Sequence, residues 1–207
     1  MNIGTTVTFV PGAAGLGSFW APIAERLPAT WHSHLVDLPG LGPVPPDPAV
    51  SSYADLVEYV SRRTTVPSLL VGQSMGGFIA LQLALRYPHL VTHLVLVALT
   101  GGVNMASHGA LDWRPDYEAT HPSTQPWARA SVPDLTAELG TIEIPTLLVW
   151  ATRDALSPLA VAHTLASKIR TTSLVTFESD DHAVACTHAA EMASALRAFV
   201  TTGGRQP

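Results

Sequence analysis

The chain has 207 residues, of which 47% are hydrophobic and 13% are charged, and its formal net charge at pH 7 is −5. This length predicts one domain, and the apolar composition excludes a disordered chain, which would carry fewer apolar and more charged residues. Lysine and arginine form no cluster that could neutralise a row of phosphates, so nucleic acid is not an expected partner.

Cys186 is the only cysteine in the sequence, so no intrachain disulfide can form, and its neighbours carry no metal or redox motif. Residues Met1–Thr6 lack the basic and apolar stretches of a secretory signal, and the apolar run Leu94–Leu99 is too short to span a bilayer. We therefore expect a soluble protein with no membrane partner. The lone cysteine is compatible with the reducing cytoplasm, where we expect the protein to reside.

Short apolar, β-branched runs alternate with longer amphipathic runs, which predicts an α/β fold whose parallel strands are joined by crossover helices. We expect each strand to be buried on both faces, because each is apolar at its centre. The expected strands are Thr5–Val10, Ser33–Val36, Ser68–Gly72, His93–Ala98, Pro145–Trp150 and Thr172–Phe177. The expected helices begin near Phe19, Tyr53, Met75, Pro158 and His188.

The segment from about residue 100 to 141 differs from the rest of the chain. It contains four prolines and the aromatic residues Trp113, Tyr117 and Trp127, but its hydrophobic periodicity is weak. A long segment of this kind inside a compact domain is usually a lid or a binding loop. We expect a single domain over residues 1–207, with this segment as a lid outside the core.

The sharpest motif is GQSMG at residues 72–76, which follows the apolar run Leu69–Val71 and precedes the helical run Phe78–Arg86. Strand, tight turn and helix are the context in which a GxSxG motif displays a nucleophilic serine. Gly72 and Gly76 remove the side chains that would collide at such a bend. The motif predicts Ser74 as a nucleophile, with the backbone N–H of Met75 available to stabilise an oxyanion.

With the following glycine, the alanine-rich helix and the segment Arg86–Pro88, this motif resembles the small esterase and lipase-like branch of the α/β-hydrolase family. The resemblance extends over most of the chain. It implies a mostly parallel sheet of about six strands flanked by helices, a reduced form of the fold with a short lid. The reduction is expected because only Met1–Gly4 precede the first strand, where most relatives have an antiparallel pair.

The resemblance also implies a base and an acid for the serine, in the chain order Ser, Asp, His that this fold uses. Asp154, on the turn after a late strand and shortly before Pro158, matches the acid, although an aspartate there could instead cap the next helix. His182, after the last strand, matches the base. The family usually has glycine before this histidine, whereas Asp181 stands here, and Asp180 or Asp181 could compete for the imidazole.

The loop after the first strand, Val10–Trp20, resembles the family loop that carries the second oxyanion donor, with Pro11 in place of the usual histidine. By position that donor is the N–H of Ala13, and Gly12 allows the backbone to approach the substrate. A phosphate-binding loop is the alternative, but both GxGxxG and Gly-Lys-Ser/Thr are missing. Asp37, in the turn after the next strand, is expected to serve turn geometry.

A small lid predicts a fairly open substrate pocket, for which aromatic and apolar side chains are candidate walls. These candidates are Phe19, Trp20, Met75, Trp113 and Trp127, for which ordinary core packing is the alternative. The pairs His32/His34 and His89/His93 lack the pattern of a metal site. We expect no metal and no cofactor.

Three functions are compatible with the sequence. The first is a serine hydrolase that cleaves an ester-like bond of a small, apolar substrate through an acyl-enzyme; the same triad also serves thioesterases, lactonases and carbon–carbon hydrolases. The second is a lyase of the hydroxynitrile type that uses the triad as acid and base. The third is a non-catalytic protein that holds a small ligand on the same fold.

Overall fold

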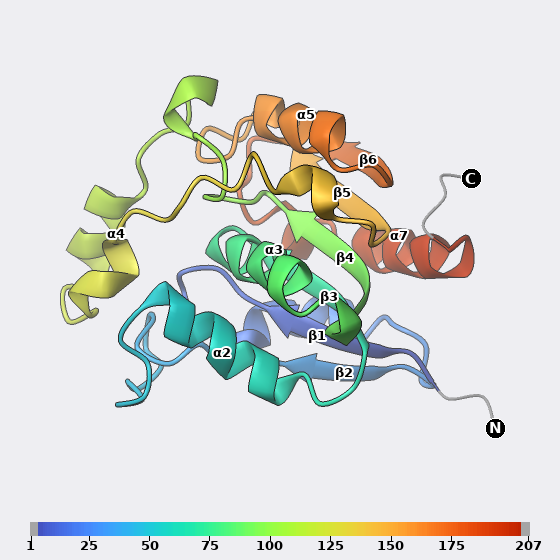
Figure 1. Cartoon of the computed structure of the whole chain (residues 1–207), viewed down its shortest axis with the longest axis horizontal. Helices are drawn as coiled ribbons and strands as arrows, with labels where there is room; N and C mark the ends of the chain where they lie inside the picture. The colour runs from blue at the N-terminus through green and yellow to red at the C-terminus, as the bar shows by residue number, and fades with distance from the viewer. Residues whose placement is uncertain (1–3, 204–207) are drawn as a thin grey trace.

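A computed structural model describes residues 4–203 of the chain (Figure 1). Its centre is a six-stranded parallel sheet in the order β2-β1-β3-β4-β5-β6. The strands are β1 (Thr6–Val10), β2 (His32–Leu35), β3 (Ser68–Gln73), β4 (Val91–Val97), β5 (Thr146–Ala151) and β6 (Thr172–Phe177). The α/β class and the six parallel strands are confirmed.

Helices cover both faces of the sheet (Figure 1). One face is covered by α2 (Tyr53–Arg63), α3 (Met75–Arg86) and α5 (Leu159–Lys168). The other is covered by α1 (Ala21–Ala24), α6 (Val184–Thr187) and α7 (Ala189–Thr201). Short 3₁₀ turns, η1 (Gly17–Trp20) and η2 (Pro88–Leu90), lead into α1 and β4. Within residues 4–203, no helix is long and apolar enough to cross a membrane.

The side chains of the central strands alternate between two hydrophobic cores. In β3, Leu70 packs into the core beneath α2 and α3, whereas Leu69 and Val71 pack into the core beneath α7. All three are fully buried. A parallel strand covered on both faces must be apolar at consecutive positions, which is why the central strands could be located from the sequence.

The expectation that every strand is buried on both faces is wrong for the two edge strands, β2 and β6. In β6, Thr176 is exposed and only Ser173 is buried. In β2, His32, Ser33 and His34 are exposed, and the strand pairs only with β1. The reason is the position of both strands at an edge of the sheet. Solvent reaches them and polar side chains are tolerated there.

The segment 100–141 contains more regular structure than its sequence indicates. It carries α4 (Arg114–Thr120) and the 3₁₀ turns η3 (Ala106–His108), η4 (Pro126–Arg129) and η5 (Leu139–Thr141). Pro115 lies in the first turn of α4, where no backbone N–H is needed. The segment projects beyond α3 (Figure 1), yet its residues Val103, Ala128 and Leu135 are buried in the main core.

The strand order determines where a site can form. β1 and β3 are neighbours in the sheet, but the chain leaves β1 toward β2 and leaves β3 toward β4, in opposite directions. At such a switch point the two outgoing loops diverge and leave a crevice at the carboxyl ends of the strands. Pro11 and Gly12 follow β1 at this point, and Ser74 follows β3.

Candidate active site

Ser74 occupies the sharp turn between β3 and α3. Its backbone has φ 55° and ψ −122°, which is a strained conformation for a residue with a side chain. Hydrogen bonds on both sides hold this turn: the N–H of Ser74 donates to the carbonyl of Val97 (2.9 Å), and the N–H of Gly77 donates to the carbonyl of Ser74 (2.9 Å). These hydrogen bonds hold the strained backbone of Ser74 in one conformation.

The two motif glycines stand where the chain is most crowded. A Cβ at Gly76 would overlap the carbonyl oxygens of Val10 and Pro11, at the end of β1. A Cβ at Gly72 would overlap the backbone of Gly76 itself. Neighbouring backbone cannot move aside as a flexible side chain can, so the turn requires glycine at both positions.

The three residues proposed as a triad meet at the carboxyl edge of the sheet. The Oγ of Ser74 lies 2.9 Å from the Nε2 of His182, and the Nδ1 of His182 lies 2.6 Å from the Oδ2 of Asp154. An ionised carboxylate only accepts hydrogen bonds, so the shared proton belongs to Nδ1. The Nε2 atom is then free to accept the proton of the serine hydroxyl.

Asp154 is almost completely buried, with a side-chain exposure of 1%. Its Oδ1 accepts hydrogen bonds from the N–H groups of Leu156 (2.8 Å) and Ser157 (3.1 Å), which leaves Oδ2 for the imidazole. The alternative in which Asp154 caps the next helix does not apply, because Pro158 occupies the N-cap of α5. Asp154 instead closes its own turn with one oxygen and holds His182 with the other.

The loop that carries His182 is fixed by hydrogen bonds that do not involve the imidazole ring. The side-chain amide of Gln73 donates to the carbonyl of His182 (3.2 Å). Asp181, which stands in place of the family glycine, accepts from the N–H of Ala183 (2.8 Å) and from the hydroxyl of Thr187. Its carboxylate therefore serves the turn and makes no hydrogen bond to the imidazole in the described part of the chain.

Two backbone N–H groups are available for an oxyanion. Met75 is the first residue of α3, so its N–H has no partner within the helix. In residues 4–203, the hydrogen bonds between backbone groups outside regular elements also leave the N–H of Ala13 unused. Gly12 lies directly against the nucleophile, since a Cβ there would be 3.2 Å from the Cβ of Ser74.

The hydroxyl of Thr100 is a polar group at the nucleophile that the sequence does not mark. Its Oγ1 lies 3.1 Å from the Oγ of Ser74. Thr100 follows β4 and belongs to no recognised motif, so only the pairing of β3 with β4 reveals it. It is 7% exposed.

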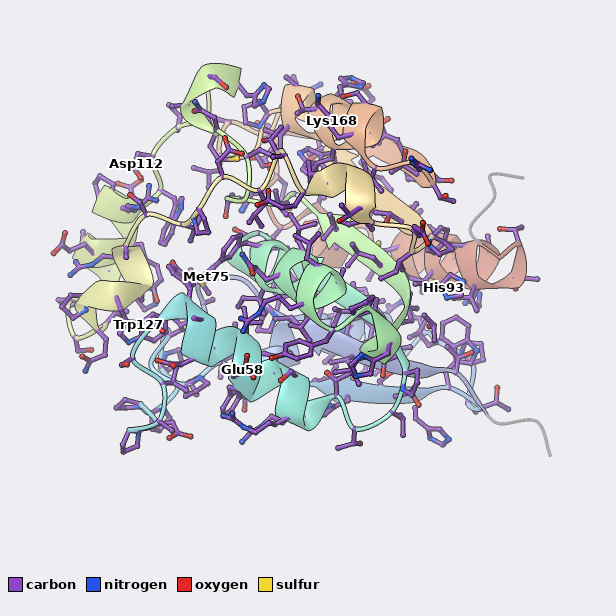
Figure 2. All side chains as sticks on the ribbon, in the orientation of Figure 1. Glu58, Met75, His93, Asp112, Trp127 and Lys168 are labelled. Atoms are coloured by element: carbon purple, nitrogen blue, oxygen red, sulfur yellow. The ribbon has the colours of Figure 1, made fainter. Side chains whose placement is uncertain are left out.

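A cavity of about 460 Å³ adjoins the nucleophile, between α3 and the segment 100–141. Met75 and Thr100 form part of its wall beside Ser74, and Figure 2 shows Met75 at the end of α3 that lies nearest the segment carrying Asp112. Apolar and polar side chains share the lining. They include Tyr53, Val103, Asn104, Met105, Leu111, Asp112, Trp113, Arg114, Val132, Asp134 and Leu156.

Three of the proposed pocket walls lie outside this cavity. Trp20 is fully buried and packs against Phe9 in the core on the other face of the sheet, with Phe19 against its edge. Trp127 packs edge-to-face against Tyr53, with ring centroids 5.7 Å apart. Trp113 and Met75 do line the cavity. Spacing along a loop could not show which side of the sheet each ring would face.

The other reactive side chains are not placed for chemistry. Burial raises the pKa of the Cys186 thiol to about 11, with a further contribution from Asp181, so the thiol is neutral at neutral pH. Within residues 4–203, no group of three or more His, Cys, Asp or Glu residues could hold a metal ion. Asp37 accepts from the N–H of Gly17 (2.7 Å), so its carboxylate joins the turn after β2 to the loop after β1 instead of making the local turn contact expected of it.

Comparison with known families supports the architecture independently. A family model described as the alpha/beta hydrolase fold matches residues 5–133, and a second, described as a TAP-like protein, matches residues 116–207. The chain belongs to the α/β-hydrolase family. It is an enzyme of the α/β-hydrolase type, and the predicted family and enzyme class are confirmed.

Curated relatives of this α/β-hydrolase are esterases. The pimeloyl-[acyl-carrier protein] methyl ester esterase of Neisseria meningitidis (strain H44/76) is 30% identical over 88% of this chain and 88% of its own length. The enzyme of the same name from Chromobacterium violaceum is 26% identical over 96% of this chain and 95% of its own.

Solved structures resemble the fold over nearly the whole chain. A putative lipase from Acinetobacter baumannii AYE superposes with a TM-score of 0.80 at 20% identity and covers 98% of this chain and 85% of its own. An esterase from Exiguobacterium antarcticum gives a TM-score of 0.76 at 19% identity and covers 97% and 93%. At these identities the likeness is one of fold.

Proposed function

We propose that this α/β-hydrolase is a serine hydrolase that cleaves a carboxylic ester through an acyl-enzyme on Ser74. The observation that supports it most strongly is the unbroken hydrogen-bond chain from the Oγ of Ser74 to His182 (2.9 Å) and on to the buried carboxylate of Asp154 (2.6 Å). A serine hydroxyl is a weak nucleophile until a base accepts its proton, and this arrangement supplies the base and holds it in the required tautomer.

In the proposed acylation, the Oγ of Ser74 attacks the ester carbonyl while its proton passes to the Nε2 of His182. The N–H groups of Ala13 and Met75 donate to the carbonyl oxygen as it becomes negative. The electron pair of the breaking ester bond goes to the alcohol oxygen, which takes the proton from His182. The alcohol then leaves, and the acyl group remains on Ser74.

In the proposed deacylation, His182 accepts a proton from a water molecule as the water oxygen attacks the acyl carbon. The same donors, Ala13 and Met75, again hold the oxyanion. When the intermediate collapses, His182 returns a proton to the Oγ of Ser74. Asp154 stays ionised throughout, because its task is to orient the imidazole and to stabilise it while it is charged.

The proposed substrate is a small ester whose acyl chain enters the cavity of about 460 Å³ beside Ser74. Met75, Val103 and Leu156 offer apolar surface there, and Asp112 and Arg114 add charged groups to the lining. The relatives' names support an ester: they act on the methyl ester of an acyl chain attached to a carrier protein. We propose the same bond type for this enzyme.

The test is a chain-length and leaving-group screen of p-nitrophenyl esters and thioesters with the wild type and Ser74→Ala. We expect the wild type to turn over short acyl esters and Ser74→Ala to lose at least about 10⁴-fold in kcat. Ser167→Ala, at an exposed serine of α5, is the matched control and should retain full activity. Undiminished activity of Ser74→Ala would overturn the proposal.

Adding a hydroxynitrile to this screen separates the alternative functions. A lyase that forms no acyl-enzyme would cleave the hydroxynitrile and leave the esters intact. A binding protein would turn over neither class of compound. Either result contradicts the serine-hydrolase proposal.

A further inference from the structure

Thr100, which follows β4, contacts the proposed nucleophile Ser74. Its Oγ1 lies 3.1 Å from the Oγ of Ser74, and its backbone N–H donates to the carbonyl of Ser74 (3.2 Å). Thr100 also lines the cavity beside the nucleophile. Thr100 therefore contacts Ser74 through both its side chain and its backbone, and it also forms part of the cavity wall.

The direction of the hydrogen bond between the two hydroxyls follows from the triad. Because Asp154 can only accept, Nδ1 of His182 carries the proton and Nε2 is an acceptor. The single proton of the Ser74 hydroxyl then points at Nε2. The hydroxyl of Thr100 must be the donor in its contact with Ser74, and the Oγ of Ser74 the acceptor.

The backbone before Thr100 is held in place by contacts from β5 and from the loop that follows β5. Ala98 has a positive φ of 43°, and its N–H donates to the carbonyl of Val149 in β5 (3.0 Å). The hydroxyl of Ser157 donates to the carbonyl of Leu99 (2.6 Å). A non-glycine residue at positive φ persists only where the surroundings enforce it, so this turn has a fixed conformation that aims Thr100 at the nucleophile.

We propose that Thr100 is a catalytic residue that donates a hydrogen bond to the Oγ of Ser74 while this oxygen leaves the acyl carbon in deacylation. The inference rests on the proposed serine-hydrolase function. In that step the bond between the acyl carbon and Oγ breaks, and its electron pair goes to Oγ. His182 delivers the proton from Nε2 to Oγ, the carboxylic acid leaves, and Thr100 keeps its own proton throughout.

The hydrogen bond favours deacylation over acylation. Before acylation, Oγ is a hydroxyl oxygen that already accepts from Thr100, so the bond stabilises the ground state as well as the transition state. In the acyl-enzyme, Oγ is an ester oxygen and a poor acceptor, and it becomes a strong one only as negative charge develops on it. Only a contact that strengthens toward the transition state accelerates a step.

The test compares Thr100→Val, which keeps the branched shape, with Thr100→Ser, which keeps the hydroxyl. Thr92→Val, at an exposed position near the start of β4, the strand that precedes Thr100, is the matched control. With p-nitrophenyl acetate in a stopped-flow instrument, the burst of nitrophenolate reports acylation and the linear phase reports deacylation. Urea unfolding of each variant reports its stability separately.

We expect Thr100→Val to slow the linear phase about tenfold, with the burst rate changed less than about threefold. Its KM should fall together with kcat, because the acyl-enzyme accumulates. Thr100→Ser should restore the linear phase to within about threefold of wild type, and Thr92→Val should match the wild type.

Three results would overturn the inference. One is an unchanged linear phase in Thr100→Val; another is an equal loss of burst and linear phases, which indicates a structural role; the third is a failure of Thr100→Ser to restore deacylation. Failure of the proposed function itself is distinguishable. In that case the wild type would show no Ser74-dependent acyl turnover at all.

Discussion

The two carboxylate oxygens of Asp154 have different hydrogen-bond partners at the candidate site. Oδ1 accepts two backbone N–H groups of its own turn, and Oδ2 faces the Nδ1 of His182 at 2.6 Å. Because both oxygens are hydrogen-bonded, the carboxylate cannot rotate away from the imidazole ring. A substitution at Asp154 that keeps the hydrogen bonds of the turn but changes the hydrogen-bond partner of Nδ1 should therefore lower activity without a comparable loss of stability.

Asp154→Asn is such a substitution. The amide oxygen can still accept from the N–H groups of the turn, but the amide nitrogen would donate to Nδ1. The imidazole proton would then lie on Nε2, and Nε2 could not act as the base. We predict a fall in kcat of about 10³- to 10⁴-fold in a p-nitrophenyl ester assay. The free energy of unfolding in urea should change by less than about 2 kcal/mol.

The control for Asp154→Asn is Asp116→Asn, at an exposed acid of α4, which should keep wild-type activity. A kcat for Asp154→Asn within tenfold of the wild type would contradict the role proposed for this carboxylate.

Local motifs made some residues predictable and left others out of reach. Ser74 could be proposed from five consecutive residues, because the turn it occupies demands glycine on both sides. Asp154 and His182 were proposed from resemblance and stay proposals that the geometry supports. Thr100 could not be found, since its contact with Ser74 depends on the pairing of two strands. Trp20 carries no signal in the sequence for the side of the sheet it faces.

At the scale of elements, α4 is tied to the loop that is proposed to hold the oxyanion. The hydroxyl of Tyr117 donates to the carbonyl of Ala13 (2.8 Å) and accepts from the N–H of Gly42 (3.1 Å). Tyr117 is buried. One phenol thus links the segment 100–141 to two loops at the carboxyl edge of the sheet.

Tyr117→Phe removes this link and leaves two backbone groups without their partner. We predict a loss of about 1–3 kcal/mol in the free energy of unfolding and a several-fold fall in kcat as the Ala13 loop loosens. Urea denaturation and the ester assay measure the two effects. Tyr59→Phe, at a partly exposed tyrosine of α2 with Arg63 over its ring, should alter neither by much. A Tyr117→Phe variant as stable and active as wild type would show that the hydroxyl of Tyr117 contributes to neither stability nor activity.

The elements themselves were predictable to the extent that their pattern is local. α2 and α3 begin at Tyr53 and Met75, near which the sequence predicts helix starts, because amphipathic spacing and the glycine-rich turn mark them. α4 could not be predicted, since its proline-rich surroundings argue against a helix. β2 was misjudged in burial because a short run of strand-forming residues does not show whether its strand lies at an edge.

At the scale of the whole molecule, the segment 100–141 shares the main core. Ala128, Leu135 and Leu139 are buried among the side chains of α2, α3 and the sheet. The N–H of Leu135 also donates to the carbonyl of Gly102 (2.8 Å), which closes the base of the segment. The order of the strands was beyond prediction from the sequence, and this order is what brings Gly12 beside Ser74.

A shared core predicts a single cooperative unfolding transition. The tryptophans Trp113 and Trp127 lie in the segment and Trp150 in β5, so fluorescence reports both parts, whereas far-UV circular dichroism reports mostly the helices and the sheet. We predict that the two urea transitions coincide. A separate fluorescence transition at lower urea would show that the segment unfolds as an independent lid.

The central claim is that Ser74 is the nucleophile. Its most direct test is to treat the protein with an activated phosphonate ester and locate the adduct by mass spectrometry. We predict one phosphonyl group per chain, carried on the peptide that contains Ser74, loss of esterase activity in step with labelling, and no adduct on Ser74→Ala. An adduct on another residue, or equal labelling of Ser74→Ala, would contradict it.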